Sequence, residues 1–401
     1  MKLIQSRIIF TALPVALAAL AFSCGGSGQT NEEMAESGRT QRTENLLTNL
    51  NKQASEKGYL FGHEDSPMYG AGWRGADDKS DIKEVTSDYP ALMGFDLGHL
   101  EIGDEINLDN VPFDSMRVQI IKQFKRGGVV TISWHPNNPL SGGTAWIADS
   151  LKETEMKTMD AILDGGEKHE LFCQWLDKAA DFINSLQTED GIKVPVIFRP
   201  WHENMGSWFW WGRDCCTVEQ YKELWKLTHD RFDKKHVTNV LWAYSPNRYW
   251  GADLSTELFS ERYPGDELVD FIGWDQYCSA EKGDSIGFAN FAAQLDSSLN
   301  VLCQFSKQHN KLPALTETGS EGIKADDFWT KTLMPVLNKY PIAYVLVWRN
   351  APQDKPGHFY APYIGHPSVS DFIKFYNDKN TLFLRDINGL YLNNDKPEAK
   401  E

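Results

Sequence analysis

The sequence predicts a single (β/α)8 barrel, in which eight parallel strands alternate with helices. Two observations predict this fold class: short apolar runs recur along the chain, and helical patterns separate them. Runs that are apolar throughout, without alternating polar residues, are typical of strands buried on both faces. The eight runs cover residues 59–63, 92–97, 129–135, 194–200, 239–245, 271–277, 312–319 and 343–350.

The segments between these runs have helical periodicity. Apolar residues recur at three- and four-residue steps, as on the buried face of a helix, in the stretches 113–124, 171–186 and 288–302. Thr217, followed three residues later by Gln220, forms a capping box and predicts that another helix begins there. Strands that alternate with helices pair in parallel, and eight such units close into a barrel.

The N-terminus has the pattern of a secretory signal. Lys2 and Arg7 make a basic start, residues 8–22 are almost wholly apolar, and Cys24 lies among small residues. The apolar run is too short for a stable transmembrane helix. We therefore expect Cys24 to become the acylated first residue of a bacterial lipoprotein, the alternative being a chance cysteine near a cleavage site.

Four parts follow from these patterns. We expect a signal peptide at 1–23, a lipid-anchored flexible tether at 24–38, the barrel at 39–391 and a polar tail at 392–401. An acidic run just after the cysteine favours export to the cell surface, and residues 25–29 contain no acid. We therefore expect a cell-envelope protein of a Gram-negative bacterium that faces the periplasm, with surface exposure as the alternative.

Composition excludes several partners. The formal net charge is −16 and no basic patch is visible, which disfavours nucleic acids and anionic membrane surfaces. The 14 Trp suit a neutral sugar polymer, because aromatic rings pack on the C–H faces of sugars. No oligomer signal is present, so we expect a monomer. The five cysteines after Cys24 lack zinc-site spacing, and their disulfide pairing stays open: Cys173, Cys215, Cys216, Cys278 and Cys303.

Polar or aromatic side chains follow nearly every predicted strand, where the active site of this fold class is built. Glu203 and Glu317 follow the fourth and seventh strands, which lie nearly opposite across the barrel mouth. Glycoside cleavage requires two carboxyl groups that flank one bond, and this pair can supply them. A structural salt bridge is the alternative for either glutamate alone. The other strand ends carry 63–65, Asp96, 134–135, 199–202, 245–247, 274–277 and 348–350.

Two of these segments resemble the signatures of glycoside hydrolase family 26: Arg-Pro-Trp-His-Glu-Asn-Met-Gly-Ser-Trp at 199–208 and Thr-Glu-Thr-Gly at 316–319. The resemblance covers most of the barrel. It implies a retaining glycosidase, of a family dominated by β-mannanases, that cleaves β-1,4-mannosidic linkages. It also implies Glu203 as acid/base and Glu317 as nucleophile. Neither a metal nor a cofactor is expected.

The resemblance further assigns contacts around the cleavage point. It implies that His135 contacts the sugar there, that His202 holds the acid/base side, and that Tyr277 hydrogen-bonds Glu317. Trp208 should stack on a neighbouring sugar. Trp146, Trp348 and either His358 or His366 would complete the substrate contacts, a choice that the sequence leaves open.

Some neighbouring residues have two interpretations. We expect Arg199 to orient carboxylates rather than to touch substrate. His63 and Asp96 are either substrate contacts or hydrogen-bonding groups of the barrel rim. One or two of the four aromatic residues at 208–211 should form a hydrophobic plug under their loop. The long stretch 136–167 should be an insertion on the catalytic face.

Three other functions compete with β-mannan cleavage. A glycosidase of the same fold could act on β-xylan or mixed-linkage β-glucan. A non-catalytic glycan-binding lipoprotein would be expected to lack one carboxylate, yet both are present. A metal hydrolase has weak support from His63-Glu64-Asp65, without a His-x-His motif. Endo or exo action, chain length and branch tolerance stay open.

Overall fold

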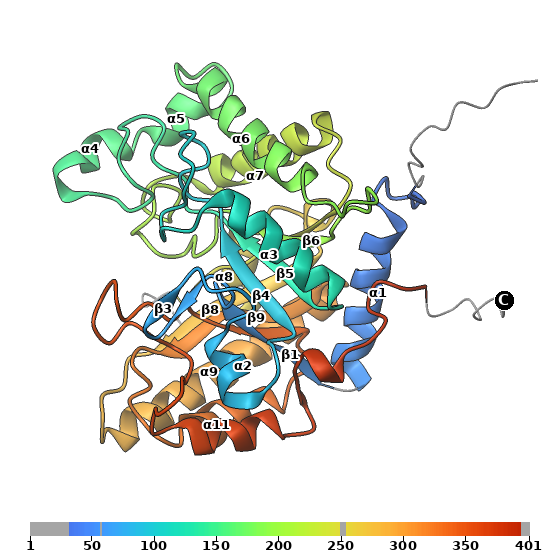
Figure 1. Ribbon diagram of the computed structural model, residues 1–401. Helices are drawn as coiled ribbons and strands as arrows, with labels where there is room; N and C mark the ends of the chain where they lie inside the picture. The colour runs from blue at the N-terminus through green and yellow to red at the C-terminus, as the bar shows by residue number, and fades with distance from the viewer. Residues whose placement is uncertain (1–31, 57, 249–253, 394–401) are drawn as a thin grey trace, which may run out of the picture.

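A computed structural model describes residues 32–56, 58–248 and 254–393 (Figure 1). Parallel strands form a barrel, and pairing of its last strand with its first closes it, so the predicted (β/α)8 fold is confirmed. Each predicted run overlaps one barrel strand, to within one residue at the end of those strands that extend beyond their run. The strands are β1 (Tyr59–Glu64), β4 (Leu92–Asp96), β5 (Val129–Ser133), β6 (Val196–Arg199), β7 (Val240–Tyr244), β8 (Phe271–Cys278), β9 (Leu312–Ser320) and β10 (Tyr344–Val347).

Helices pack around the outside of the barrel. The predicted stripes 113–124 and 288–302 lie in α3 (Phe113–Lys125) and α9 (Ser285–Gln308), and the stripe 171–186 runs two residues beyond the end of α6 (His169–Asn184). The capping box is confirmed at the start of α7, where the Thr217 hydroxyl accepts from the Gln220 amide at 3.1 Å. The outer segments are α2 (Asp81–Thr86), α3 (Phe113–Lys125), α6 (His169–Asn184), α7 (Val218–Lys234), α8 (Thr256–Glu261), α9 (Ser285–Gln308), a π-helix (Trp329–Leu333), α10 (Met334–Leu337) and α11 (Val369–Tyr376). Short 3-10 turns occur at Asp266–Leu268 and Leu384–Asp386.

One end of the barrel is covered by a helix that the sequence patterns did not predict. Leu46 and Leu50 of α1 (Gln41–Glu56) are buried in one cluster with strand residues such as Leu60 and Leu241. The added strand β11 (Thr381–Leu382) pairs with β1 near this end. Figure 1 shows α1 and the C-terminal segment at one end of the barrel, and the hairpin β2 (Tyr69–Gly70)–β3 (Trp73–Arg74) at the opposite end.

The insertion 136–167 lies at the carboxyl end of the strands, as predicted. It contains a 3-10 turn (Asp149–Leu151), α4 (Lys152–Glu155) and α5 (Thr158–Ile162). Backbone hydrogen bonds fasten it to the loop after β6: the Ile147 amide donates to the Trp208 carbonyl at 2.7 Å, and the Trp210 amide donates to the Ala145 carbonyl at 3.1 Å. The two loops therefore form one wall of the catalytic end.

The expected signal peptide and Cys24 lie outside the described residues, as does 394–401. Glu32, the first described residue, contacts the barrel domain: its carboxylate accepts from the Lys193 amide at 3.1 Å and pairs with Arg42 at 3.4 Å. Across the described ranges, no helix has the length and apolar character needed to span a membrane. The five cysteines that follow Cys24 are all free thiols.

Candidate active site

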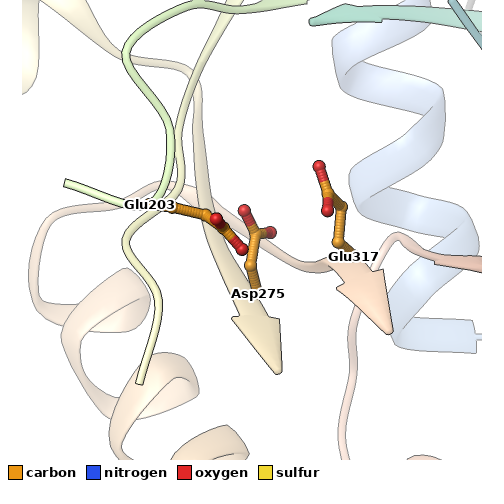
Figure 2. A group of neighbouring side chains, drawn as sticks. All are labelled: Glu203, Asp275 and Glu317. Atoms are coloured by element: carbon orange, nitrogen blue, oxygen red, sulfur yellow. The ribbon is translucent and has the colours of Figure 1, made fainter. Parts of the chain in front are cut away.

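Three carboxylates meet at the carboxyl ends of the strands (Figure 2). One oxygen from each of Glu203, Asp275 and Glu317 lies within 4.8 Å of the other two. Retaining glycosidases hold their two carboxyl groups about 5–5.5 Å apart, and inverting enzymes about 6.5–9.5 Å apart. The separation of Glu203 and Glu317 therefore fits the retaining geometry.

Arg199 of β6 binds two of these carboxylates. It is 1% exposed, and its Nη1 donates to Asp275 Oδ2 at 2.9 Å and to Ser245 Oγ at 3.0 Å. Its Nη2 donates to Glu317 Oε1. A buried guanidinium is stable only when its charge and its donors are satisfied together. The expectation that Arg199 orients carboxylates is thus confirmed. The guanidinium lies between Asp275 and Glu317, and its positive charge compensates the negative charge of these carboxylates.

Glu317 is held from its other side by Tyr277. The Tyr277 hydroxyl donates to Glu317 Oε2 at 2.6 Å, as predicted. The pairing of β8 with β9 shifts register between Trp274 and Asp275, so that Asp275 faces Glu317. Irregularities of this kind re-aim side chains at active sites. With a donor on each oxygen, the Glu317 carboxylate is fixed toward the barrel mouth.

Glu203 leaves its strand through a strained turn. Its φ is +53°, a left-handed conformation that costs about 1–3 kcal/mol for a residue other than glycine. The surroundings hold the turn: the Glu203 amide donates to the Ser245 carbonyl at 2.8 Å. The Asn247 side chain accepts from the amides of Met205 and Gly206 at 3.1 and 3.0 Å. The turn lifts the carboxyl group off β6 and toward Glu317.

The environment of Glu203 favours its protonated form. Burial and, to a smaller extent, the negative charge of Glu317 raise the pKa of Glu203 to about 7. The indole Nε1 of Trp208 donates to Glu203 Oε2 at 2.8 Å and partly offsets these effects. Glu203 can therefore carry a proton near neutral pH while Glu317 is paired with Arg199.

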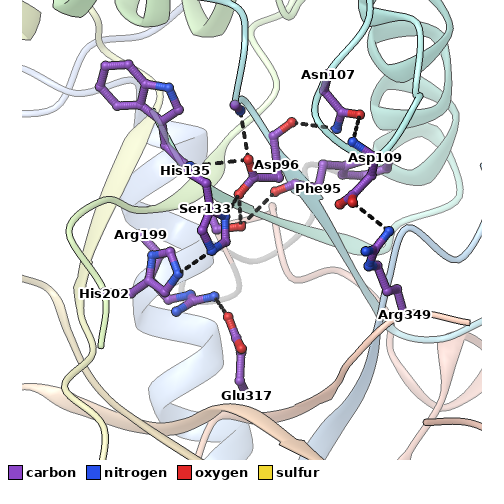
Figure 3. A network of polar contacts seen from close by, with 12 residues as sticks. Phe95, Asp96, Asn107, Asp109, Ser133, His135, Arg199, His202, Glu317 and Arg349 are labelled. Atoms are coloured by element: carbon purple, nitrogen blue, oxygen red, sulfur yellow. Dashed lines mark hydrogen bonds and ion pairs between the residues drawn. The ribbon is translucent and has the colours of Figure 1, made fainter. Parts of the chain in front are cut away.

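Two of the predicted substrate contacts, His135 and His202, lie next to each other in Figure 3. His135 Nε2 and His202 Nε2 lie 3.0 Å apart, beside Arg199 and Glu317. The Trp146 ring stacks on His135 with centroids 5.1 Å apart and planes at 9°. The Trp348 ring lies edge-on to His135 at 6.4 Å. Trp146 and Trp208 stay 44% and 38% exposed, and so present aromatic faces beside the carboxylates.

The prediction that one or two of the four aromatic residues at 208–211 form a buried plug was wrong, because three of them do. Phe209, Trp210 and Trp211 are all buried, and Trp208 alone of the four is exposed. Phe209 stacks on Trp211 at 4.5 Å, and the indole Nε1 of Trp210 donates to the Pro136 carbonyl at 3.0 Å. The insertion covers this loop, so a larger plug is buried than a loop by itself could hide.

The two alternative histidines after β10 differ in their links to the site. His358 pairs with Glu321 at 2.8 Å and contacts the Tyr360 ring at 5.4 Å. Tyr360 in turn contacts the Tyr277 ring at 5.5 Å. His366 hydrogen-bonds Ser368 at 2.9 Å instead and packs on neighbouring aromatic rings. His358 is therefore connected to the catalytic region through Tyr360.

Sequence reasoning missed Asp275 and Tyr360 as members of the site. Asp275 did stand at a predicted strand end, which was a usable signal. Asp96 is 1% exposed and accepts from Ser133 Oγ and the Gly98 amide, both at 2.7 Å, so it belongs to the barrel rim. His63 is equally buried, at 1% exposure.

A closed (β/α)8 barrel with paired glutamates at the carboxyl ends of its fourth and seventh strands is the architecture of a barrel-type glycoside hydrolase. A model of glycosyl hydrolase family 26 matches residues 35–319. The chain belongs to this family.

Known relatives agree with this assignment. A mannan endo-1,4-β-mannosidase of Bifidobacterium adolescentis is 32% identical over 289 residues, covering 68% of this chain and 28% of that protein. One from Bacillus subtilis strain 168 is 28% identical over 279 residues, covering 67% of this chain and 68% of that protein. The structure of a family 26 β-mannanase from Bacteroides ovatus superposes with a TM-score of 0.83 at 46% identity, covering 90% of this chain and 99% of that one.

Proposed function

We propose that this protein hydrolyses β-1,4-mannosidic linkages in mannan or manno-oligosaccharides by a retaining double displacement. The observation that carries the proposal is the close pair of glutamates in unlike environments: Glu317 is fixed by Arg199 and Tyr277, and Glu203 is held protonated by burial. Two carboxyl groups whose environments favour opposite protonation states are the usual mark of an acid and a nucleophile.

In the first step the Glu317 carboxylate attacks the anomeric carbon and forms a glycosyl–enzyme ester. Glu203 gives its proton to the departing glycosidic oxygen. The ester removes the negative charge of Glu317, which had raised the pKa of Glu203. Glu203 is therefore more readily ionised in the second step and can act as a base. It takes a proton from a water molecule, which attacks the anomeric carbon and releases the Glu317 carboxylate.

The choice of mannan is supported by the relatives, whose names describe mannan endo-1,4-β-mannosidases, and by the exposed rings of Trp146 and Trp208 beside the carboxylates. The test is to incubate the protein separately with linear mannan, xylan and mixed-linkage glucan and to size the products. We expect oligosaccharides from mannan, with the first product in the β configuration by proton NMR. Faster cleavage of xylan or glucan would contradict the substrate, and an α product would contradict the mechanism.

The two glutamates can be separated by chemical rescue. Glu203→Ala should lower turnover of mannan about 10²–10⁴-fold, the usual contribution of general acid–base catalysis. With an activated aryl leaving group the first step needs no acid, so azide should restore turnover and yield a β-glycosyl azide. For Glu317→Ala azide should attack from the vacated face and yield the α product. The same results with the variants exchanged would swap the two roles.

We propose further that the protein acts as a monomer anchored in the cell envelope through a lipid on Cys24. The support is the sequence pattern of residues 1–24, a secretory signal that leads to a cysteine among small residues. A tether between the lipid and the barrel would leave the catalytic end of the barrel accessible to oligosaccharides.

A further inference from the structure

Three side chains from neighbouring strand ends form a hydrogen-bonded chain below the barrel mouth (Figure 3). His135 Nδ1 lies 2.7 Å from Asp96 Oδ2, and His135 Nε2 lies 3.0 Å from His202 Nε2. Asp96 also accepts from Ser133 Oγ at 2.7 Å and is held in place by the Gly98 amide. Asp96, His135 and His202 are 1%, 6% and 1% exposed, so water does not screen their interactions.

The proton positions follow from counting donors. An ionised carboxylate only accepts, so His135 Nδ1 must carry a proton. The two Nε2 atoms face one another, so one of them donates and the other accepts. Burial lowers the pKa of His135, but the adjacent Asp96 carboxylate outweighs it and the net pKa is raised. Burial lowers the pKa of His202, and the charges of Arg199 and His135 lower it further.

Other charged groups near these three side chains favour the same protonation states. Glu317 of β9 and Asp109, in the loop after β4, also favour a positive charge on His135, although Arg349 pairs with Asp109. Arg199 of β6 disfavours a charge on His202. The stable state therefore has His135 protonated on both nitrogens, and neutral His202 accepts through Nε2 and carries its own proton on Nδ1.

We propose that Asp96 is a positioning residue that sets the tautomer of His202 through His135. By keeping both His135 nitrogens protonated, Asp96 places the His202 proton on Nδ1, in the residue next to Glu203. This Nδ1 is buried and hydrogen-bonds none of the described residues, so its N–H is a donor that the protein itself leaves unused. A buried unpaired donor is costly, which favours a ligand hydroxyl as its partner. The role in catalysis rests on the proposed glycosidase activity.

Asp96→Ala tests the inference because it removes both the charge and the acceptor that hold a proton on His135 Nδ1. His135 should then become neutral, and its proton can lie on either ring nitrogen. Because one of the two Nε2 atoms must donate across the 3.0 Å contact, His202 should then populate both tautomers. The protonation and tautomer of each ring can be measured by ¹⁵N NMR with labelled histidine, assigned with a His202→Gln variant.

In the wild type we expect a doubly protonated His135 and a His202 tautomer with the proton on Nδ1. Asp96→Ala should give a mixture of His202 tautomers and lower kcat/KM about 2- to 10-fold, the size of one lost hydrogen bond between neutral groups. In the same variant the alkaline limb of the pH dependence of kcat/KM should move to higher pH, because the charge of His135, which lowers the pKa of Glu203, is lost. A purely structural role of Asp96 would not move this limb.

Ser133→Ala is the matched control, because it removes one hydrogen bond to Asp96 and leaves the carboxylate charge. It should leave unchanged the protonation of His135, the tautomer of His202 and the alkaline limb of kcat/KM. A wild-type His202 with its proton on Nε2 would overturn the inference without any variant, and so would an Asp96→Ala spectrum in which His202 keeps the single wild-type tautomer. The spectra are recorded on the free enzyme and do not depend on its activity. A wild-type protein that cleaves no β-glycan would therefore refute the proposed function and leave the spectra as the test of the tautomer.

Discussion

Trp208→Phe should extend activity to higher pH, although it removes a contact to the general acid. The indole Nε1 donates to Glu203 Oε2 at 2.8 Å and so stabilises the ionised carboxylate. Phenylalanine keeps an aromatic face for sugar stacking and loses the donor. Because Glu203 acts in its protonated form, a higher pKa of Glu203 preserves the active form at higher pH. The alkaline limb of kcat/KM should therefore move upward.

The size of the shift follows from that one hydrogen bond. A hydrogen bond to a charged group contributes about 1.5–3 kcal/mol when buried, and one pKa unit corresponds to about 1.4 kcal/mol. Trp208 is 38% exposed, so water replaces part of the lost interaction and the lower end applies. The pKa of Glu203 should rise from about 7 by at most about one unit.

The assay is the pH dependence of kcat/KM on a manno-oligosaccharide, whose natural leaving group requires the acid. Trp146→Phe is the control: the same substitution in another exposed ring of the site, which stacks on His135 instead of bonding Glu203. It should change the affinity for substrate and leave the alkaline limb in place. A limb that stays fixed or moves down in Trp208→Phe would refute the account of the Glu203 environment.

Two further predictions concern folding and location. Gly94→Ala should destabilise the protein by about 1–3 kcal/mol, because a Cβ there would lie 1.7 Å from Oε2 of the buried Glu64. The measurement is the melting temperature, which should fall; an unchanged value would contradict this packing. Cys24→Ala should release the protein from the membrane fraction with its specific activity unchanged, and continued membrane association would contradict lipid anchoring.

The barrel could be predicted because its strands are buried on both faces and so stay apolar throughout. Helix α1 gave a weaker signal. Most of its residues are polar, and only a narrow stripe that includes Leu46 and Leu50 covers the strand ends. A stripe of this width is a normal feature of a surface helix but a poor pattern in a single sequence.

Within the site, residues at strand ends could be predicted, and those placed by irregular backbone could not. Asp275 faces Glu317 through the register shift in β8, and Tyr360 reaches Tyr277 from a loop without periodicity. Neither the bulge nor the loop path is encoded in residue spacing. The buried plug of Phe209 and its neighbours depends likewise on a covering insertion that lies far away in the sequence.

The division of labour between the glutamates begins in the short segment after β6. Arg199 faces into the barrel and directs its donors to Asp275 and Glu317, while Glu203, four residues later, turns out of the strand at a positive φ. The guanidinium donates to Ser245, Asp275 and Glu317, whereas the Glu203 carboxylate receives the neutral indole donor of Trp208. One strand end therefore supplies both the cation that fixes the nucleophile and the acid that lacks such a cation. Glu203 lies at a positive φ with its carboxyl group against the Trp208 indole, and its burial there keeps its pKa at about 7, which is the difference on which the mechanism depends.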